Sequence, residues 1–262
     1  MANRVFGIEL ARTGRLGTVH TAYAQTAPWD DAVMRRDWLP AEPEPPKDEV
    51  DWDAWLGPCP WRPYNSAYVS GQWRGHYDFH TGCIGEWGAH TVVQVQTGIS
   101  ASHTSAVEYE YGDNPYGDGL VAHFASGVKM ILVRSHECWP GYSGQRFDGT
   151  EGWIANSGDS HDQSRASSPS LLAGIQKVIA DYVARTQCLM NHARNFLDCV
   201  RSRRPPVANA EVMYHSMCTV HAANICMWLK HNRKFDPVKA EFVNDPEANR
   251  LCSRAMREPW CL

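Results

Sequence analysis

The 262-residue sequence lacks the fingerprint of a nucleotide-binding fold. A dinucleotide site needs a strand, a Gly-x-Gly-x-x-Gly turn and a helix, so that phosphates meet the backbone amides at the helix N-terminus. Gly117-Asp118-Gly119 is followed by strand-like residues 120–124, and residues 141–144 lie between two expected strands. A P-loop and a Gly-x-Ser-x-Gly nucleophile elbow are also missing. We therefore expect no NAD site within these residues.

Long apolar runs and an excess of basic residues are missing as well. No stretch approaches the ~20 apolar residues that cross a bilayer, and the first 17 residues lack the apolar core of a signal peptide. A formal charge of −4 is poorly suited to nucleic acid. The nine cysteines include no Cys-x-x-Cys pair, which favours a reducing compartment, although Cys252 and Cys261 could pair in an oxidising one. We expect a cytoplasmic protein that binds neither membranes nor nucleic acid.

Aromatic and histidine side chains, in contrast, are abundant: 11 Trp, 10 Tyr and 12 His. Flat apolar faces with a polar group suit carbohydrate rings, but a large aromatic core or a subunit interface explains them equally well. Residues 39–66 are so rich in proline that we expect a long ordered arm without regular structure. Trp52, Trp55 and Trp61 are expected to pack this arm down.

The remaining pattern predicts an α+β fold, a meander of antiparallel strands with helices on one side. Residues 1–262 are taken as one domain. Hydrophobic periodicity and turn residues predict these elements: a helix within 1–17, a strand at 18–26, a helix at 84–97, strands at about 105–112, 118–125, 127–134, 142–148 and 151–156, and helices at about 170–203 and 209–231.

Three stretches resemble the Gfo/Idh/MocA oxidoreductases, especially the branch with Trp-rich insertions. They are DWDAWLGPCPWRPYN (51–65), residues 72–91 ending in GEWGAHT, and the tail from residue 195 to residue 260. In that family a Rossmann domain precedes a segment like residues 9–21. The resemblance therefore implies the C-terminal substrate and oligomerisation domain without the Rossmann domain. It also implies an open, mostly antiparallel sheet with helices on one face, homo-oligomers formed through the open face, and a saccharide substrate.

The resemblance places the candidate active site at Glu86 and His90. In the family pattern an acidic residue and a histidine four apart line the site, and the histidine acts as an acid/base. That spacing puts both side chains on one face of a helix, where a carboxylate can fix the imidazole tautomer. The pattern is altered nearby: Val93 replaces an acidic residue, His80 a glycine and His76 a Trp or Phe. The family's catalytic lysine belongs to the missing domain.

These histidines suggest a metal-assisted alternative. His76, His80, Glu86 and His90, with His123 or His136, could build an open His/carboxylate site for a divalent metal, Zn or Mn. The alternative is that they donate hydrogen bonds to sugar hydroxyls or are satisfied in the core.

The accumulation of histidine without a cofactor half favours a NAD-independent carbohydrate lyase or hydrolase. Arg74 would neutralise a uronate carboxylate, and His80, His90 and Tyr77 would serve as base and acid beside Glu86. The substrate-binding candidates are Arg74, His76, Asp78, Tyr116 and His123. Three alternatives stay open: the substrate subunit of a split NAD(P)-dependent sugar oxidoreductase whose Rossmann domain is on another chain, a non-catalytic sugar-binding remnant, and a truncated form of a longer protein.

Overall fold

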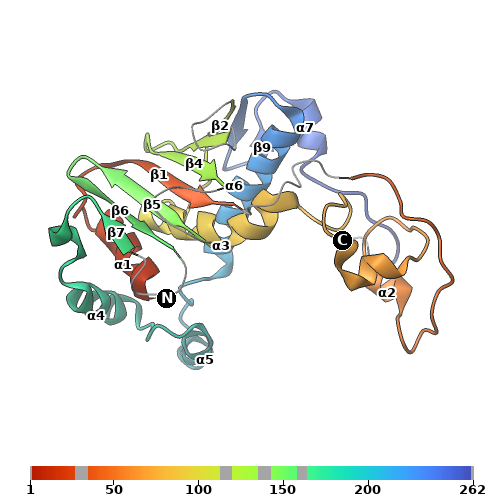
Figure 1. Cartoon of the computed structure of the whole chain (residues 1–262), viewed down its shortest axis with the longest axis horizontal. Helices are drawn as coiled ribbons and strands as arrows, with labels where there is room; N and C mark the ends of the chain where they lie inside the picture. The colour runs from red at the N-terminus through yellow and green to blue at the C-terminus, as the bar shows by residue number, and fades with distance from the viewer. Residues whose placement is uncertain (1, 27–34, 113–119, 135–142, 158–163, 261–262) are drawn as a thin grey trace.

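The computed structural model describes residues 2–26, 35–112, 120–134, 143–157 and 164–260, with the Cys83 side chain left out. One nine-stranded open sheet runs through it in the order β7-β6-β5-β1-β4-β3-β2-β8-β9 (Figure 1). Only β1 and β4 pair in parallel, so the sheet is mostly antiparallel, as expected. The strands are β1 (Val19–Gln25), β2 (Glu108–Tyr111), β3 (Leu120–His123), β4 (Lys129–Val133), β5 (Gln145–Gly149), β6 (Gly152–Asn156), β7 (Ser164–Ala166), β8 (Arg233–Asp236) and β9 (Glu241–Phe242).

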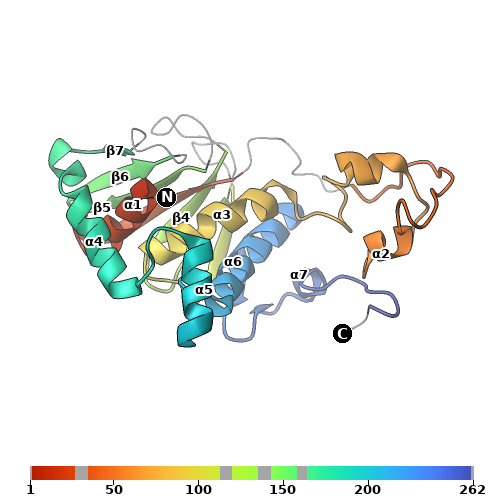
Figure 2. The same ribbon diagram turned by 90° about the horizontal axis from the view of Figure 1, so that it is seen from below.

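The longest helices cover one face of this sheet, which confirms the predicted α+β class (Figures 1 and 2). None of the helices in the described ranges is long and apolar enough to span a membrane. The helices are α1 (Ala2–Arg12), α2 (Trp52–Leu56), α3 (Gly82–Gly98), α4 (Ile175–Thr186), α5 (His192–Ser202), α6 (Ala210–Leu229) and α7 (Pro246–Arg250).

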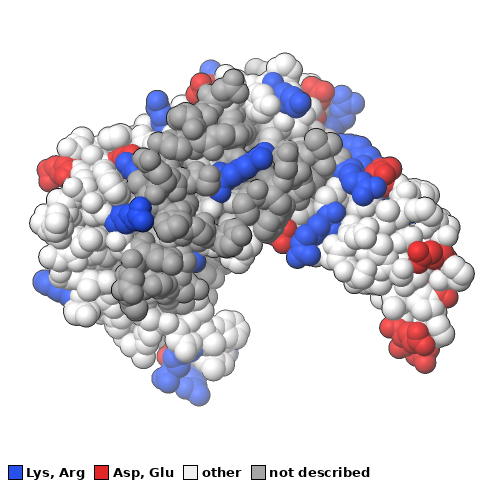
Figure 3. All heavy atoms as spheres, in the orientation of Figure 1, with Lys and Arg blue, Asp and Glu red and all other residues white. Residues whose placement is uncertain are grey.

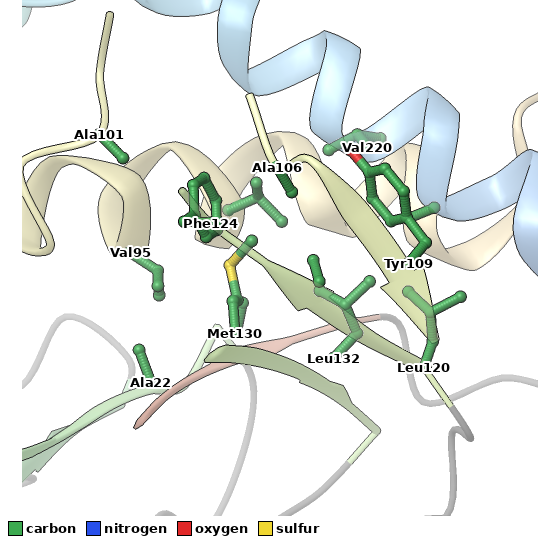
Figure 4. Close-up of a cluster of buried hydrophobic side chains, with 14 of the residues drawn as sticks. Ala22, Val95, Ala101, Ala106, Tyr109, Leu120, Phe124, Met130, Leu132 and Val220 are labelled. Carbon is green, nitrogen blue, oxygen red and sulfur yellow. The ribbon is translucent and has the colours of Figure 1, made fainter. Parts of the chain in front are cut away.

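The main core lies between the sheet and the pair α3 and α6. Side chains alternate along a strand, so every second residue of each central strand faces these helices. Ala22, Met130, Ala122 and Tyr109 form one such row across β1, β4, β3 and β2, and all four are fully buried. Figure 4 labels Ala22, Met130 and Tyr109 of this row, with Val95 of α3 and Val220 of α6 in the same cluster. This packing fixes α3, and with it the candidate site residues that α3 carries.

The prediction of one continuous helix over residues 170–203 is wrong, because the structure has two helices there, α4 and α5. A short 3-10 turn (Pro169–Leu172) precedes α4, and α4 ends where Gln187 adopts a left-handed φ of 58°. Met190 also has a positive φ, and the Asn191 side chain then caps α5 by accepting from the Arg194 amide. In α6, Asn209 is the N-cap, and its side chain accepts from the Val212 amide.

Residues 35–81, here called the Trp-rich lobe, stand apart from the sheet (Figures 1 and 2). The lobe has its own small core of Trp52, Leu56, Tyr64 and Tyr68. Phe79 packs against it, and α2 interrupts the stretch expected to lack regular structure. The predicted limits of the arm, residues 39–66, are therefore not confirmed.

The C-terminal segment returns to this lobe. Arg257 donates to the Cys59 carbonyl and forms an ion pair with Asp53 in α2. Arg254 donates to the carbonyl of His80, immediately before α3. Residues 174 to 204 positions apart thus hold the lobe beside the start of α3.

Candidate active site

The candidate site forms where the last residues of the Trp-rich lobe fold over the first turns of α3. The chain enters α3 through Thr81 and Gly82, whose φ of 72° suits glycine. A Cβ atom at Gly85 would lie 1.8 Å from Thr81 Oγ1, so the close approach of the loop requires a glycine there. The Asn224 amide of α6 also donates to the Thr81 carbonyl. Two helices, α3 and α6, therefore position Thr81.

His80, Glu86 and Arg74 form a connected polar group. Glu86 Oε2 lies 2.9 Å from His80 Nε2, and Glu86 Oε1 accepts from Arg74 Nε at 3.1 Å. The amides of Gly75 and Gly82 both point at His80 Nδ1, at 3.3 Å each. Because Nδ1 accepts these two bonds, the ring proton lies on Nε2 and is donated to Glu86. His80 is buried, so this arrangement makes it an anchor for the Glu86 carboxylate.

His90 lies one turn further along α3 and is exposed. Its ring meets the Trp87 ring edge to face, with centroids 5.7 Å apart. Glu86 does not hydrogen-bond to His90 in the described structure; its two oxygens are used by His80 and Arg74. Helical side chains tilt toward the N-terminus, so Glu86 leans toward the loop and away from His90. The expectation that Glu86 orients His90 is not what the structure shows.

The expected metal ligands do not come together. His76 is fully buried inside the lobe, where its ring lies 5.1 Å from the Tyr68 ring. His90 is exposed on α3, so only His80 and Glu86 meet. No group of three His, Cys, Asp or Glu side chains suited to a metal occurs within the described ranges. The predicted ligand set is therefore not supported.

Tyr77 and Asp78 lie near the site but are engaged by arginines. The guanidinium carbons of Arg36 and Arg254 lie 4.3 and 4.7 Å from the centre of the Tyr77 ring. Asp78 is ion-paired with Arg62, which is buried. Tyr77 thus has cations against its ring, and Asp78 is half of an ion pair.

His123 lies on the opposite face of the sheet. Its neighbours Ala122 and Leu120 face the helices, so His123 points to the open face, where its ring is 3.0 Å from Glu110. The prediction that His123 lines the same pocket as His90 is therefore wrong. Tyr116 and His136 lie outside the described residues.

Two residues at the site were not predicted from the sequence. Trp73 meets His80 edge to face at 5.4 Å, and the Arg74 guanidinium lies 4.5 Å from the Trp73 ring centre. Arg254 reaches the site from the far end of the chain. Trp73 could have been predicted as a site residue, because it directly precedes the candidate Arg74 in the sequence. No local sequence pattern indicates Arg254.

Replacing His76 by phenylalanine is expected to raise stability at acidic pH. Burial lowers the pKa of His76, and the nearby cations Arg35 and Arg62 lower it further. The unfolded chain therefore takes up a proton below pH ~6.5 that the folded chain resists, and stability falls as the pH drops. Neither ring nitrogen has a hydrogen bond of normal geometry in the described structure. Phenylalanine removes these two buried polar atoms, so it should raise the free energy of unfolding by about 1 kcal/mol.

Urea unfolding between about pH 7.5 and 5 measures this effect. His221, whose pKa is lowered by burial and then by Arg254, acts in the same direction, so the slope of stability against pH should shrink in the variant and not vanish. An unchanged slope would contradict the assignment of His76.

Comparison with known proteins shows the family. The matching family model is the oxidoreductase family, C-terminal alpha/beta domain, of the Gfo/Idh/MocA type, and the match covers residues 18–262. No curated protein sequence matches the chain.

Solved structures are similar to the chain at low sequence identity. The WlbA dehydrogenase from Bordetella pertussis, in complex with NADH and UDP-GlcNAcA, is 11% identical with a TM-score of 0.51, over 90% of this chain and 60% of that one. The aldose-aldose oxidoreductase from Caulobacter crescentus, complexed with glycerol, is 13% identical with a TM-score of 0.48, over 90% and 61%. The myo-inositol dehydrogenase from Corynebacterium glutamicum is 14% identical with a TM-score of 0.42, over 90% and 64%. The chain spans about three fifths of these structures' length.

The family match corrects the functional expectation. A family of oxidoreductases contradicts the expectation that the chain is a carbohydrate lyase or hydrolase. Three of the histidines that suggested such chemistry have other places in the structure: His76 is buried in the lobe, His80 anchors Glu86, and His123 lies on the open face of the sheet. The chain belongs to the Gfo/Idh/MocA oxidoreductase family, as its C-terminal alpha/beta domain.

Proposed function

We propose that these residues are the substrate-binding half of a sugar oxidoreductase whose dinucleotide-binding unit lies outside this sequence, on a partner chain. The family match supports the class of reaction. The sequence offers no Gly-x-Gly-x-x-Gly turn between a strand and a helix, so its own residues do not fit a nicotinamide dinucleotide. We therefore derive no step through that cofactor.

The observation that carries the proposal is the uncovered apolar face of α5. Phe196, Leu197 and Val200 are 59%, 54% and 49% exposed, and Leu189 just before the helix is equally uncovered. A cavity of about 450 Å³ lies along this face. Its walls are Phe196, Cys199, Val200, Arg203, Arg204, Pro205 and Pro206. An apolar helical stripe of this kind marks an interaction surface.

Position and charge indicate what covers α5. In both views α5 lies at the lower edge of the molecule, away from the Trp-rich lobe (Figures 1 and 2). Arg203 and Arg204, just after α5, line the cavity, and α5 itself carries Arg194 and Arg201. The one acidic residue of α5, Asp198, is ion-paired with Arg194. Basic side chains appear at this corner in Figure 3. The remaining two fifths of the neighbours' length is enough for a nucleotide-binding unit, and we assign the α5 face to that unit with an acidic contact surface.

Within this assembly, His90 would accept the proton of the sugar hydroxyl that is oxidised. Its imidazole is exposed on α3 and is not tied to a carboxylate in the described structure. The Arg74–Glu86–His80 group presents a half-exposed guanidinium one turn away, which can donate to further hydroxyls and orient the ring.

The open face of the sheet is our candidate for homo-oligomer formation. Ile131 and Trp153, which are partly exposed, pack there against the buried side chains of Tyr23 and Val133 in a cluster separate from the main core. The guanidinium of Arg146 lies 4.3 Å from the Trp153 ring centre. Aromatic and arginine side chains of this kind are enriched in interfaces.

Replacing Leu197 by glutamate should weaken binding of the nucleotide-binding partner by about tenfold or more, since burying one leucine contributes roughly 1.5–3 kcal/mol. The tagged chain is purified from its own organism, co-purifying chains with a dinucleotide fingerprint are quantified, and NAD(P)-dependent oxidation of a sugar panel is measured. Val238→Glu is the matched control, because Val238 is 92% exposed and lies outside α5. The proposal fails if no such chain co-purifies and no sugar is oxidised, or if both variants behave alike.

A further inference from the structure

An aromatic cleft lies in the Trp-rich lobe beside the candidate active site. It has a volume of about 220 Å³, and its walls are Trp55, Trp73 and Phe79, with Cys59 and Asp78. Trp55 is held in place by stacking on Trp52, with ring centroids 4.8 Å apart, and Phe79 meets Trp55 edge to face at 5.0 Å. The cleft is therefore formed by fixed rings, and it is large enough for one sugar ring.

The polar groups of this cleft suit a neutral ligand. Asp78 Oδ2 is ion-paired with the buried Arg62, which cancels the charge of the carboxylate. Asp78 Oδ1 has no hydrogen bond within the described structure and can accept one from a hydroxyl. Aromatic rings beside an unpaired carboxylate would favour a cationic ligand, but the positive charge of Arg62, which is paired with Asp78, opposes the binding of a cation. Flat apolar walls with a free acceptor favour the C–H face and hydroxyls of a neutral sugar.

Trp73 connects the cleft to the candidate active site. One side of its ring faces the Arg74 guanidinium at 4.5 Å, and His80 meets it edge to face at 5.4 Å. The same residue is a wall of the cleft. A ring bound in the cleft would therefore neighbour a ring bound at Arg74 and Glu86.

We infer that this cleft is a subsite for a second, neutral sugar ring, so that the substrate is a glycoside of at least two rings. The inference about the substrate rests on the proposed function, whereas binding in the cleft does not. A disaccharide would contribute one ring to each place, and each aromatic wall would contribute to its affinity. A monosaccharide would gain only one of these contacts.

The test measures saccharide binding to the purified full chain. Binding is detected by the change in tryptophan fluorescence and by saturation-transfer NMR. The probes are the neutral disaccharides maltose, cellobiose and lactose, the monosaccharides glucose and galactose, and tetramethylammonium as a cationic probe. At least one disaccharide should bind about tenfold more tightly than its component monosaccharides, which corresponds to about 1.4 kcal/mol. Trp73→Ala and Trp55→Phe should weaken this binding, while Trp61→Ala, at an exposed tryptophan outside the cleft, should leave it unchanged.

Urea unfolding of each variant shows whether the lobe stays folded, and Trp55→Phe retains an aromatic ring if alanine does not fold. The inference is overturned if no disaccharide binds at about 10 mM, if binding is indifferent to both cleft variants, or if only tetramethylammonium binds. Disaccharide binding without sugar oxidation by the purified assembly would overturn the proposed function alone. Oxidation of monosaccharides without disaccharide binding would overturn the subsite alone.

Discussion

Asp78→Ala is expected to destabilise the Trp-rich lobe by about 3–5 kcal/mol, because it leaves the charge of Arg62 buried without its partner. The Arg62 side chain is only 2% exposed. Its Nε and Nη1 atoms already lack hydrogen bonds in the described structure, so the ion pair with Asp78 compensates for much of the desolvation of the guanidinium. The guanidinium carbon also lies 4.5 Å from the Phe79 ring centre, which ties the pair to the core of the lobe.

Urea unfolding followed by tryptophan fluorescence measures this loss, since Trp52 and Trp55 report on the same lobe. Asp37→Ala is the matched control, because its partner Arg35 is exposed and an exposed ion pair contributes little to stability. A double variant, Arg62→Met with Asp78→Leu, should lose less than Asp78→Ala alone, because no buried charge remains. Equal losses for Asp78→Ala and Asp37→Ala would show that Arg62 is hydrated and not buried as described.

The sheet and α3 were predictable because their sequence signals are local. β3 and β4 are short, mostly apolar runs on either side of the turn signal Ser126-Gly127, and both features are visible in the sequence. The break between α4 and α5 was not visible, since Gln187 and Met190 carry no glycine or proline signal for a positive φ.

The candidate site was predictable only in part, for a similar reason. The spacing of Glu86 and His90 indicates a shared helix face, which the structure has. It does not indicate which partners the carboxylate takes, because His80 and Arg74 belong to a loop of irregular conformation. The contact of Arg254 with His80 joins residues 174 positions apart, and no pattern within a helix or strand encodes it.

His90→Gln is expected to lower kcat for sugar oxidation by the assembled enzyme by roughly 10²–10⁴, the usual contribution of a positioned acid/base group. Glutamine keeps a polar side chain of similar length but cannot accept and release a proton near neutral pH. His90 has one ring contact in the described structure, with Trp87, so folding and KM should change little. The bell-shaped pH dependence that an acid/base group imposes should flatten in the variant.

His103→Gln is the control for this experiment, because His103 is an exposed histidine away from the site. Glu86→Gln separates positioning from proton transfer. It weakens the bonds to His80 and Arg74, so it should raise KM more than it lowers kcat and should retain the pH profile. If His90→Gln instead matches His103→Gln in rate and pH profile, another group takes the hydroxyl proton, and His90 serves only as an exposed residue of α3.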